Sequence, residues 1–265
     1  MEVNLLARPK ALKDWFDAEL AASLADKIGP HHPDFHGPAF VREIASAIAG
    51  QELKQRVDTM ADALARQLPS DYRRALAIFS EILGPENPHE TGMFKEGYWL
   101  MPVARYVEKY GRREFDLSLD FIGELTKRHT GEYAIRPFLV AQPAATLEIL
   151  KRWSRSANFH LRRLASEGPR PRLPWAQRID LFDDHTETIE AILDNLKSDP
   201  SLFVRKSVAN HLGDLLKDHR AEAMALLSRW NAGAGPHTRW IIKHALRGPI
   251  KKGDVEAIAL VAPGA

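Results

Sequence analysis

The second half of the chain repeats one local order, a short helix, a turn and a longer helix. This repetition restricts the fold more than any other feature of the sequence. The copies span residues 133–153, 159–196 and 202–230, and a partial fourth copy spans 238–246. A helix pair of this kind cannot bury its apolar face alone, so neighbouring pairs must stack to share one continuous core.

Helical apolar spacing continues through nearly the whole chain. Apolar residues recur at intervals of three and four in the segments 12–28, 40–48, 53–68, 72–83 and 99–107, which is the pattern of amphipathic helices. Prolines and glycines fall between these segments, and the alternation that is typical of strands is essentially missing. The sequence therefore predicts an all-α protein.

The segment 198–206 resembles a HEAT repeat. It has a proline turn followed by a helix with Arg205 near its start, and in HEAT proteins this pattern recurs about every 40 residues. We therefore expect an α–α superhelix of HEAT-like repeats with a concave basic face. It would form a single domain over 1–265, with N-terminal helices over 1–114 and the repeats, which carry the functional residues, over 115–265.

Composition excludes several classes of function. The 265 residues include no cysteine, so disulfides, thiolate metal sites and a cysteine nucleophile are excluded. No phosphate-binding glycine loop, Gly-x-Ser-x-Gly elbow or His-Glu-x-x-His string occurs. The eleven histidines do not present two ligands on one helix face. We expect neither a metal nor another cofactor.

The sequence shows no membrane or export signal. The first 13 residues lack the apolar stretch and cleavage site of a secretory signal. No run of about 18 apolar residues occurs anywhere. We expect a cytoplasmic monomer that does not contact membranes.

Positive charge is segregated, although the net charge is only +2. From Lys151 to Arg178 eight basic residues stand against a single acid. The repeat order places Arg162, Arg205 and Arg239 at equivalent points of successive helices, where they would line one face. Such a stripe is typical of phosphate binding, and the alternative is a set of solvated helix faces. The candidate phosphate ligands are Arg136, Arg162, Arg163, Arg170, Arg172, Arg205, Lys206, Arg239 and Lys243.

A proline-rich insert lies inside the second copy of the repeat. Residues 166–175 contain three prolines, two arginines and a terminal Trp175. The prolines favour a stiff, extended path, which suits a functional loop that offers phosphate and stacking contacts. The alternative is a structural connector with Trp175 packed into the core.

Three strings of the sequence resemble the AlkC branch of the DNA alkylation repair glycosylases, which are HEAT-like proteins related to AlkD. The strings are Thr130 to Leu139 (TGEYAIRPFL), Arg162 to Trp175 (RRLASEGPRPRLPW) and Val204 to Asp214 (VRKSVANHLGD). The resemblance covers most of the chain and is densest between residues 115 and 252.

The resemblance implies a function and a partner. It implies a monofunctional, metal-free DNA glycosylase that binds double-stranded DNA on a concave face. The expected lesions are cationic bases such as 3-methyladenine and, for this branch, 3-methylcytosine. Some members carry an additional C-terminal immunoglobulin-like domain. Because the chain ends at Ala265, soon after the last expected helix, we expect this domain to be missing.

Excision of a cationic base depends on carboxylates. The charged base is already a good leaving group, so the enzyme must mainly stabilise an oxocarbenium-like sugar and position a water molecule. The resemblance places Glu132, Glu167 and Asp214 at the acids of the family's active site. We expect Glu132 or Asp214 to orient the water and the other acids to stabilise charge.

Each acid also has an ordinary interpretation. Glu132 fits a helix start, where an acid interacts favourably with the helix dipole. Glu167 fits a salt bridge with Arg163 four residues earlier, and Asp214 fits a surface pair with Lys217.

Aromatic side chains offer a second type of contact, because a cationic base stacks favourably on an aromatic ring. The candidates for contact with the lesion or its sugar are Trp175, Trp240 and Tyr133. Two other classes of protein remain open at this stage: a HEAT-like scaffold that binds a protein partner, and a nucleic-acid-binding module without catalysis.

Overall fold

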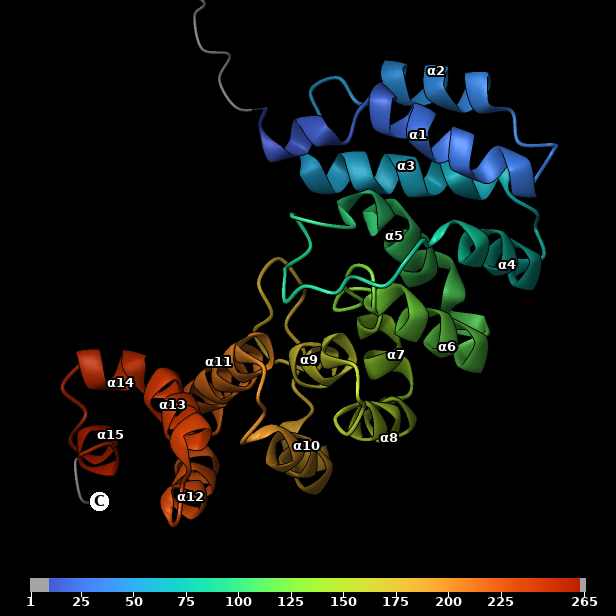
Figure 1. The fold of residues 1–265 in the computed structure, drawn as a ribbon. Coiled ribbons are helices and arrows are strands. Elements are labelled where there is room, and N and C mark those ends of the chain that lie inside the picture. The colour runs from blue at the N-terminus through green and yellow to red at the C-terminus, as the bar shows by residue number, and fades with distance from the viewer. Residues whose placement is uncertain (1–9, 263–265) are drawn as a thin grey trace, which may run out of the picture. The chain divides into compact units, whose positions relative to one another are not determined.

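The computed structural model describes residues 10–262, which form helices joined by turns and loops (Figure 1). No strand occurs in this part of the chain, and the expected all-α, HEAT-like class is confirmed. The described residues form two compact units. The first runs up to Pro85 and resumes over 97–121, and the second comprises 86–96 and the residues from Ile122 onwards.

The boundary between the units differs from the one that we expected. We placed the division at residue 115, whereas the packing puts it inside α6 (Phe115–Thr126), after Phe121. The loop 86–96 also belongs with the second unit, because its long-range contacts are with residues such as Asn158 and His160. That the chain acts as one domain stays a prediction.

The first unit is a helical bundle with an apolar core. Its α-helices are α1 (Ala18–Ile28), α2 (Gly37–Ala47), α3 (Leu53–Gln67), α4 (Tyr72–Ile82) and α5 (Met101–Tyr110), and its 3-10 helices are η1 (Leu12–Trp15), η2 (Gly29–His31), η3 (Tyr98–Leu100) and η4 (Gly111–Arg113). Helix α1 packs on α2 and α4, α2 packs on α3, and α3 packs on α5. Phe16, Phe40 and Phe79 are fully buried between these helices.

The second unit contains the repeats. Its helices are α7 (Arg136–Ala141), α8 (Pro143–Trp153), α9 (Phe159–Glu167), α10 (Phe182–Leu196), α11 (Leu202–Asp218), α12 (Arg220–Asn231), α13 (Pro236–Ala245), α14 (Arg247–Lys251) and α15 (Val255–Leu260). Helix α11 packs between α9 and α13, and α8 packs on α10. The first helices of successive repeats, α9, α11 and α13, therefore lie side by side (Figure 1). This is the stacking that the repeats predict.

Local chemistry defines where the repeat helices start. The side chain of Asn158 accepts hydrogen bonds from the first turn of α9, and Ser201 does the same for α11, which satisfies backbone N–H groups that have no partner inside the helix. An arginine follows four residues after each cap. Nη1 of Arg162 donates to the carbonyls of residues 156 and 157, and Nη1 of Arg205 donates to those of residues 199 and 200. The two arginines are therefore equivalent, as the repeat order predicts.

None of the helices within residues 10–262 has both the length and the apolar character that a membrane crossing requires.

Candidate active site

Five side chains of alternating charge form one continuous network in the second unit. Oε2 of Glu132 lies 2.7 Å from Nη1 of Arg163, and Nη2 of Arg163 lies 3.7 Å from Oε1 of Glu167. The same oxygen of Glu167 lies 2.7 Å from Nη1 of Arg170, whose Nη2 lies 3.0 Å from Oδ2 of Asp214. We call these five residues the acid–arginine network. It brings together the three acids that the resemblance selected.

The acids of the network are buried. The exposed fractions of Glu132, Glu167 and Asp214 are 4%, 6% and 4%. Burial raises the pKa of the Glu167 carboxyl, but the charges of Arg163 and Arg170, together with hydrogen bonds to this carboxyl, outweigh it, so its pKa lies below the usual value. Glu167 is therefore a carboxylate at neutral pH, although little water reaches it.

The network is supplied by a turn, by α9 with the loop that follows it, and by α11. Arg163 and Glu167 lie on α9, Arg170 lies in the loop after α9, and Asp214 lies on α11. Glu132 lies in a turn before α7 and not at the head of that helix, where we expected it.

Two glycines let these segments approach one another. A Cβ at Gly131 would lie 2.6 Å from Oγ1 of Thr126, and a Cβ at Gly168 would lie 2.9 Å from Cγ2 of Ile135. A larger residue at either position would push the turn or the loop away from its neighbours.

Hydroxyl groups complete the network, and sequence reasoning missed them. The hydroxyl of Thr130 donates to Oε2 of Glu132 at 3.0 Å. The hydroxyl of Ser207 donates to the carbonyl of Arg163 at 3.5 Å, and Ser207 also contributes to the lowered pKa of Glu167. Ser207 lies two helical turns before Asp214 on α11, on the same face of the helix. That spacing is the signal that identifies it. The bond from Thr130 holds the carboxylate of Glu132 in a fixed orientation.

A buried histidine lies beside the network. Burial lowers the pKa of His211 to about 4, and the charge of Arg170 acts in the same direction, so the ring is neutral at pH 7. Its Nδ1 lies 2.8 Å from the carbonyl oxygen of Ser166. Since a carbonyl only accepts, Nδ1 carries the proton. Nε2 is then an unprotonated nitrogen that is buried and has no hydrogen-bond partner in the described part of the chain.

The proline-rich insert presents Trp175 to solvent. The side chain is 53% exposed, so the alternative of a connector with Trp175 in the core is wrong. The Trp175 backbone has a φ of 66°, the left-handed region that a tryptophan rarely adopts. The ring of Phe94 lies 5.7 Å from that of Trp175, and the hydroxyl of Tyr133 donates to the carbonyl of Pro174 at 3.1 Å. Tyr133 thus fixes the insert, and its contact with a lesion stays a prediction.

Several arginines that we expected on a phosphate-binding surface are engaged inside the protein. Arg136 is buried, and its guanidinium donates to the carbonyls of Gly168, Arg170 and Gln177. It ties the insert to α7, which corrects the expectation of an exposed phosphate ligand. Arg163 and Arg170 belong to the network. Arg172, in contrast, is exposed, and both oxygens of Asp218 accept hydrogen bonds from it at 2.7 and 2.6 Å.

The equivalent arginines of the repeats also make internal contacts. Besides closing its own turn, Arg162 pairs with Asp199 at 2.6 Å, and so links one repeat to the next. The guanidinium of Arg205 lies 5.7 Å from the ring of Trp240, which stacks on His244. These contacts explain the arginine at the fourth position of α9 and α11 as a feature of the fold.

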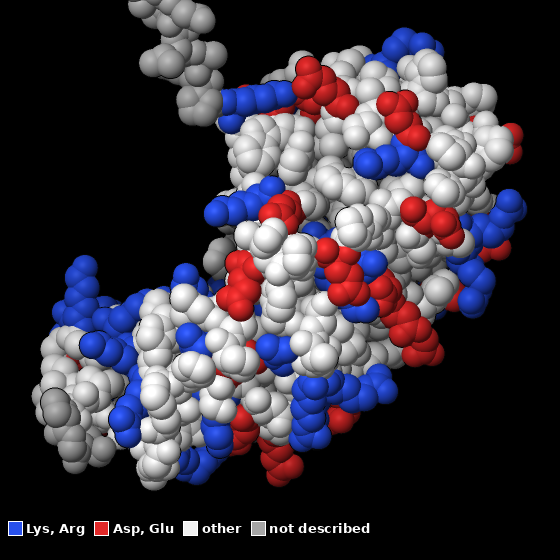
Figure 2. Space-filling view, in the orientation of Figure 1, with Lys and Arg blue, Asp and Glu red and all other residues white. Residues whose placement is uncertain are grey.

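The remaining predicted cations are exposed. Lys206 on α11 and Arg239 and Lys243 on α13 are open to solvent. Figure 2 shows that lysine and arginine predominate over acids on the visible surface of α13 and α14. The role of these residues as phosphate ligands stays a prediction. Within residues 10–262 no group of three or more histidine, aspartate or glutamate side chains is arranged to hold a metal ion.

These features define a helical-repeat protein with a buried centre of carboxylates and guanidinium groups. The family model described as DNA alkylation repair enzyme matches residues 128–248, a range that includes the whole acid–arginine network.

Two relatives cover nearly the whole chain. The uncharacterized protein YhaZ of Bacillus subtilis is 38% identical over 250 residues, which are 94% of this chain and 67% of YhaZ. The solved structure of Pseudomonas fluorescens alkylpurine DNA glycosylase AlkC, bound to DNA containing an abasic site analog, is 37% identical, with a TM-score of 0.85, and the match covers 97% of this chain and 69% of AlkC.

The chain therefore belongs to the DNA alkylation repair enzyme family, and its similarity to AlkC confirms the branch that the three strings indicate. AlkD2 of Streptococcus mutans, 18% identical with a TM-score of 0.39, is too distant to carry an argument. The expectation that an immunoglobulin-like domain is missing stays a prediction.

Proposed function

We propose that this protein is a monofunctional DNA glycosylase that hydrolyses the N-glycosidic bond of cationic alkylated bases. The expected lesions are 3-methyladenine and 3-methylcytosine, and the expected partner is double-stranded DNA bound by a monomer. The observation that carries the proposal is the acid–arginine network, in which three buried acids from separate segments converge. The similarity to AlkC, a glycosylase solved with DNA, supports it.

The chemistry needs negative charge near the sugar. When the bond between C1′ and the base breaks, both electrons go to the base, which leaves uncharged, and the sugar becomes an oxocarbenium-like cation. A carboxylate in a medium of low dielectric stabilises that cation far more than it would in water. A water molecule then attacks C1′ and transfers a proton to a carboxylate, which completes hydrolysis.

The roles of the three acids follow from their surroundings. Glu167 accepts from Arg170 and also pairs with Arg163, so it has two arginine partners and is the acid best fixed as a stabilising charge. Glu132 and Asp214 lie at the two ends of the network, each with one arginine partner. We assign one of these two to orientation of the water.

The arginines of the network have a complementary role. Carboxylates close to a DNA phosphate repel it, and bare carboxylates in the interior take up protons. Arg163 and Arg170 counter both effects, because their charges lower the pKa of Glu167 and reduce the net negative charge that a phosphate meets.

The experiment compares base release with DNA binding. The variants are Glu132→Gln, Glu167→Gln and Asp214→Asn, each measured for release of methylated bases from methylated DNA with the products resolved. We expect single-turnover release to fall by about 100-fold or more, the usual effect of removing one preorganised charge or donor, while the affinity for an abasic-site duplex changes by only a few-fold.

A matched control is Glu148→Gln on α8, since Glu148 is exposed and forms an ion pair with Lys151 at 3.4 Å, outside the acid–arginine network. It is expected to release bases like the unchanged protein. Unchanged release of 3-methyladenine by both Glu132→Gln and Asp214→Asn would exclude the proposed roles. Tight DNA binding without any base release by the unchanged protein would favour a non-catalytic DNA-binding module.

A further inference from the structure

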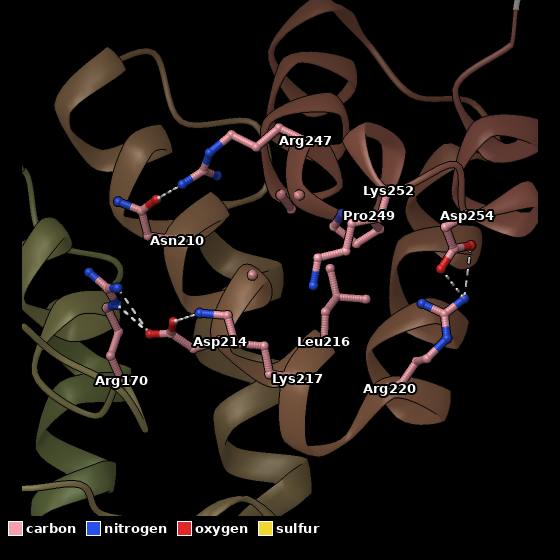
Figure 3. A pocket seen from close by; sticks show the side chains of 13 residues that line it. Arg170, Asn210, Asp214, Leu216, Lys217, Arg220, Arg247, Pro249, Lys252 and Asp254 are labelled. Atoms are coloured by element: carbon pink, nitrogen blue, oxygen red, sulfur yellow. Dashed lines mark hydrogen bonds and ion pairs between the residues drawn. The ribbon is translucent and has the colours of Figure 1, made fainter.

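A pocket of about 640 Å³ opens at the Asp214 end of the acid–arginine network (Figure 3). It is bounded by α11, the start of α12, the end of α13, α14 and the turn before α15. Figure 3 shows Asp214 at its wall, between Arg170 and Lys217. The charged lining consists of the basic residues Arg170, Lys217, Arg220, Arg247 and Lys252 and the acids Asp214 and Asp254.

Three of the five cations are already neutralised by acids. Arg170 and Lys217 pair with Asp214 at 3.0 and 3.3 Å. Arg220 pairs with Asp254 at 3.0 Å and with Glu256 at 2.8 Å. These pairs leave little charge for a ligand.

The other two cations have no acidic partner among the described residues. Nη2 of Arg247 donates to Oδ1 of Asn210 at 2.9 Å, a neutral acceptor that orients the guanidinium without cancelling its charge. Lys252 lines the pocket with an exposed side chain. The pocket therefore holds two uncompensated positive charges, one of them a preoriented guanidinium.

We propose that this pocket binds one phosphodiester of the DNA strand that carries the lesion, at a linkage next to the reacting nucleotide, with Arg247 and Lys252 as its ligands. This inference rests on the proposed function and adds a binding site to it. A guanidinium offers paired N–H donors that match phosphate oxygens, and an ammonium adds a point charge. Because Asp214 belongs to both the pocket and the network, a phosphate held here fixes the register of the nucleotide at the acids.

The backbone of the pocket also leaves room for such a ligand. A Cβ built on Gly248 meets no atom within 4 Å, so this part of the lining faces open space. A side chain introduced at Gly248 can therefore change the charge of the pocket without disturbing the packing.

The first test compares how removal of Lys252 and removal of the neighbouring Lys251 affect the affinity for DNA. Lys252→Ala should weaken binding of an abasic-site duplex roughly tenfold, as loss of a charge-assisted hydrogen bond does, and lower the slope of log affinity against log salt by about one. Lys251→Ala is the matched control, since Lys251, the last residue of α14 and the neighbour of Lys252, is exposed but does not line the pocket. Equal effects of the two variants would overturn the proposal.

The second test adds charge where nothing is packed. Gly248→Glu should weaken binding at least as much as Lys252→Ala, whereas the isosteric Gly248→Gln should have little effect. If the two Gly248 variants bind equally, the pocket does not hold an anion.

The third test locates the phosphate. A set of abasic-site duplexes carries a neutral methylphosphonate at a different single linkage in each. The affinity of the unchanged protein should fall when the methylphosphonate replaces one or two linkages beside the lesion. The affinity of Lys252→Ala should not depend on its position. If every methylphosphonate lowers the affinity equally, the pocket does not bind a specific phosphate, even if bases are released. If the loss is confined to linkages beside the lesion but no base is released, the pocket assignment stands and the glycosylase proposal is wrong. Failure of the pocket assignment and failure of the proposed function are therefore distinguishable.

Discussion

The two units of the molecule bury very different side chains. Among the described residues of the first unit, Ser118 is the only buried polar one, and charged residues such as Lys109 and Asp62 pair in contact with solvent. The described residues of the second unit include six buried charged residues and four buried histidines, which are Glu132, Arg136, Glu167, Arg170, Asp199, Asp214, His129, His160, His211 and His219.

The buried charges of the second unit are not explained by stability, so this difference between the units indicates a functional role for them. Moving an ion out of water costs several kcal/mol even when it is paired, and an apolar replacement of a buried pair is often as stable. The first unit follows the arrangement that favours stability, with an apolar core and charges in water. The second unit keeps charges in a medium of low dielectric, where they act strongly on a reacting group. The contrast supports the proposal that the chemistry takes place in the second unit.

The largest expected effect comes from removing one paired cation of each unit, an arginine in the second unit and a lysine in the first. Arg170→Met leaves Glu167 and Asp214 short of a partner in the interior, and we expect it to lower the free energy of unfolding by about 3–5 kcal/mol. Lys109→Met in the first unit removes a pair with Asp62 whose side chains remain about a quarter to a third exposed, and should cost less than about 1 kcal/mol. Urea unfolding of both variants measures the difference.

A combined variant sharpens this comparison. Adding Glu167→Gln and Asp214→Asn to Arg170→Met removes the unpaired charges, so part of the lost stability should return. Similar losses for Arg170→Met and Lys109→Met would show that the network is not buried in solution in the way that the structure describes.

A smaller effect is expected from pH. Burial holds the pKa of His211 at about 4, against an ordinary value of 6.5. Between these two values the unfolded chain binds a proton that the folded chain does not, so the folded state loses stability as the pH falls from 6.5 to 4. The expected loss from this one group is about 3 kcal/mol.

The measurement is urea unfolding at several pH values between 7 and 4. His211→Asn keeps a donor for the carbonyl of Ser166 but does not titrate, so it should flatten the pH dependence. Part of the slope should remain, because burial also lowers the pKa of His129, to about 3. His36→Asn in the first unit, where the ring is exposed, is the control. An identical slope for His211→Asn and the unchanged protein would contradict the buried, neutral ring.

Sequence reasoning found the helices and the repeats because both depend on local spacing. The 3.6-residue period and the breakers between helices lie within a few residues of one another. The equivalence of Arg162 and Arg205 was predictable for the same reason, since each closes a turn five and six residues earlier.

The partners of the charged residues were not predictable. Arg136 donates to carbonyls 32, 34 and 41 residues away, and Arg162 pairs with an acid 37 residues away. A count of charges along the chain cannot distinguish a guanidinium that reaches solvent from one that holds a loop. The three acids were found only through the resemblance, because their ordinary partners, Arg163 for Glu167 and Lys217 for Asp214, are also present.

The smallest expected effect on stability concerns backbone strain, and here too the units differ. The left-handed positions of the first unit are all glycines, at residues 50, 84 and 97, whereas Trp175 in the second unit is the one non-glycine residue with positive φ in the described part of the chain. A left-handed conformation at a residue with a Cβ costs about 1–2 kcal/mol. A strained, exposed aromatic in the same insert as Arg170 is explained if stacking on the lesion requires it.

Trp175→Gly separates strain from function. Relief of the strain should leave the free energy of unfolding unchanged or raise it by up to about 1 kcal/mol, because the exposed ring buries little area. Base release should nevertheless fall at least about tenfold, since stacking of a base on an aromatic ring contributes about 1–3 kcal/mol. Trp175→Ala keeps the Cβ and therefore the backbone strain. Its base release should fall as in Trp175→Gly, but its free energy of unfolding should not rise. If Trp175→Gly instead unfolds more easily while it releases bases normally, the ring serves the fold, and the strain at this position has no part in recognition.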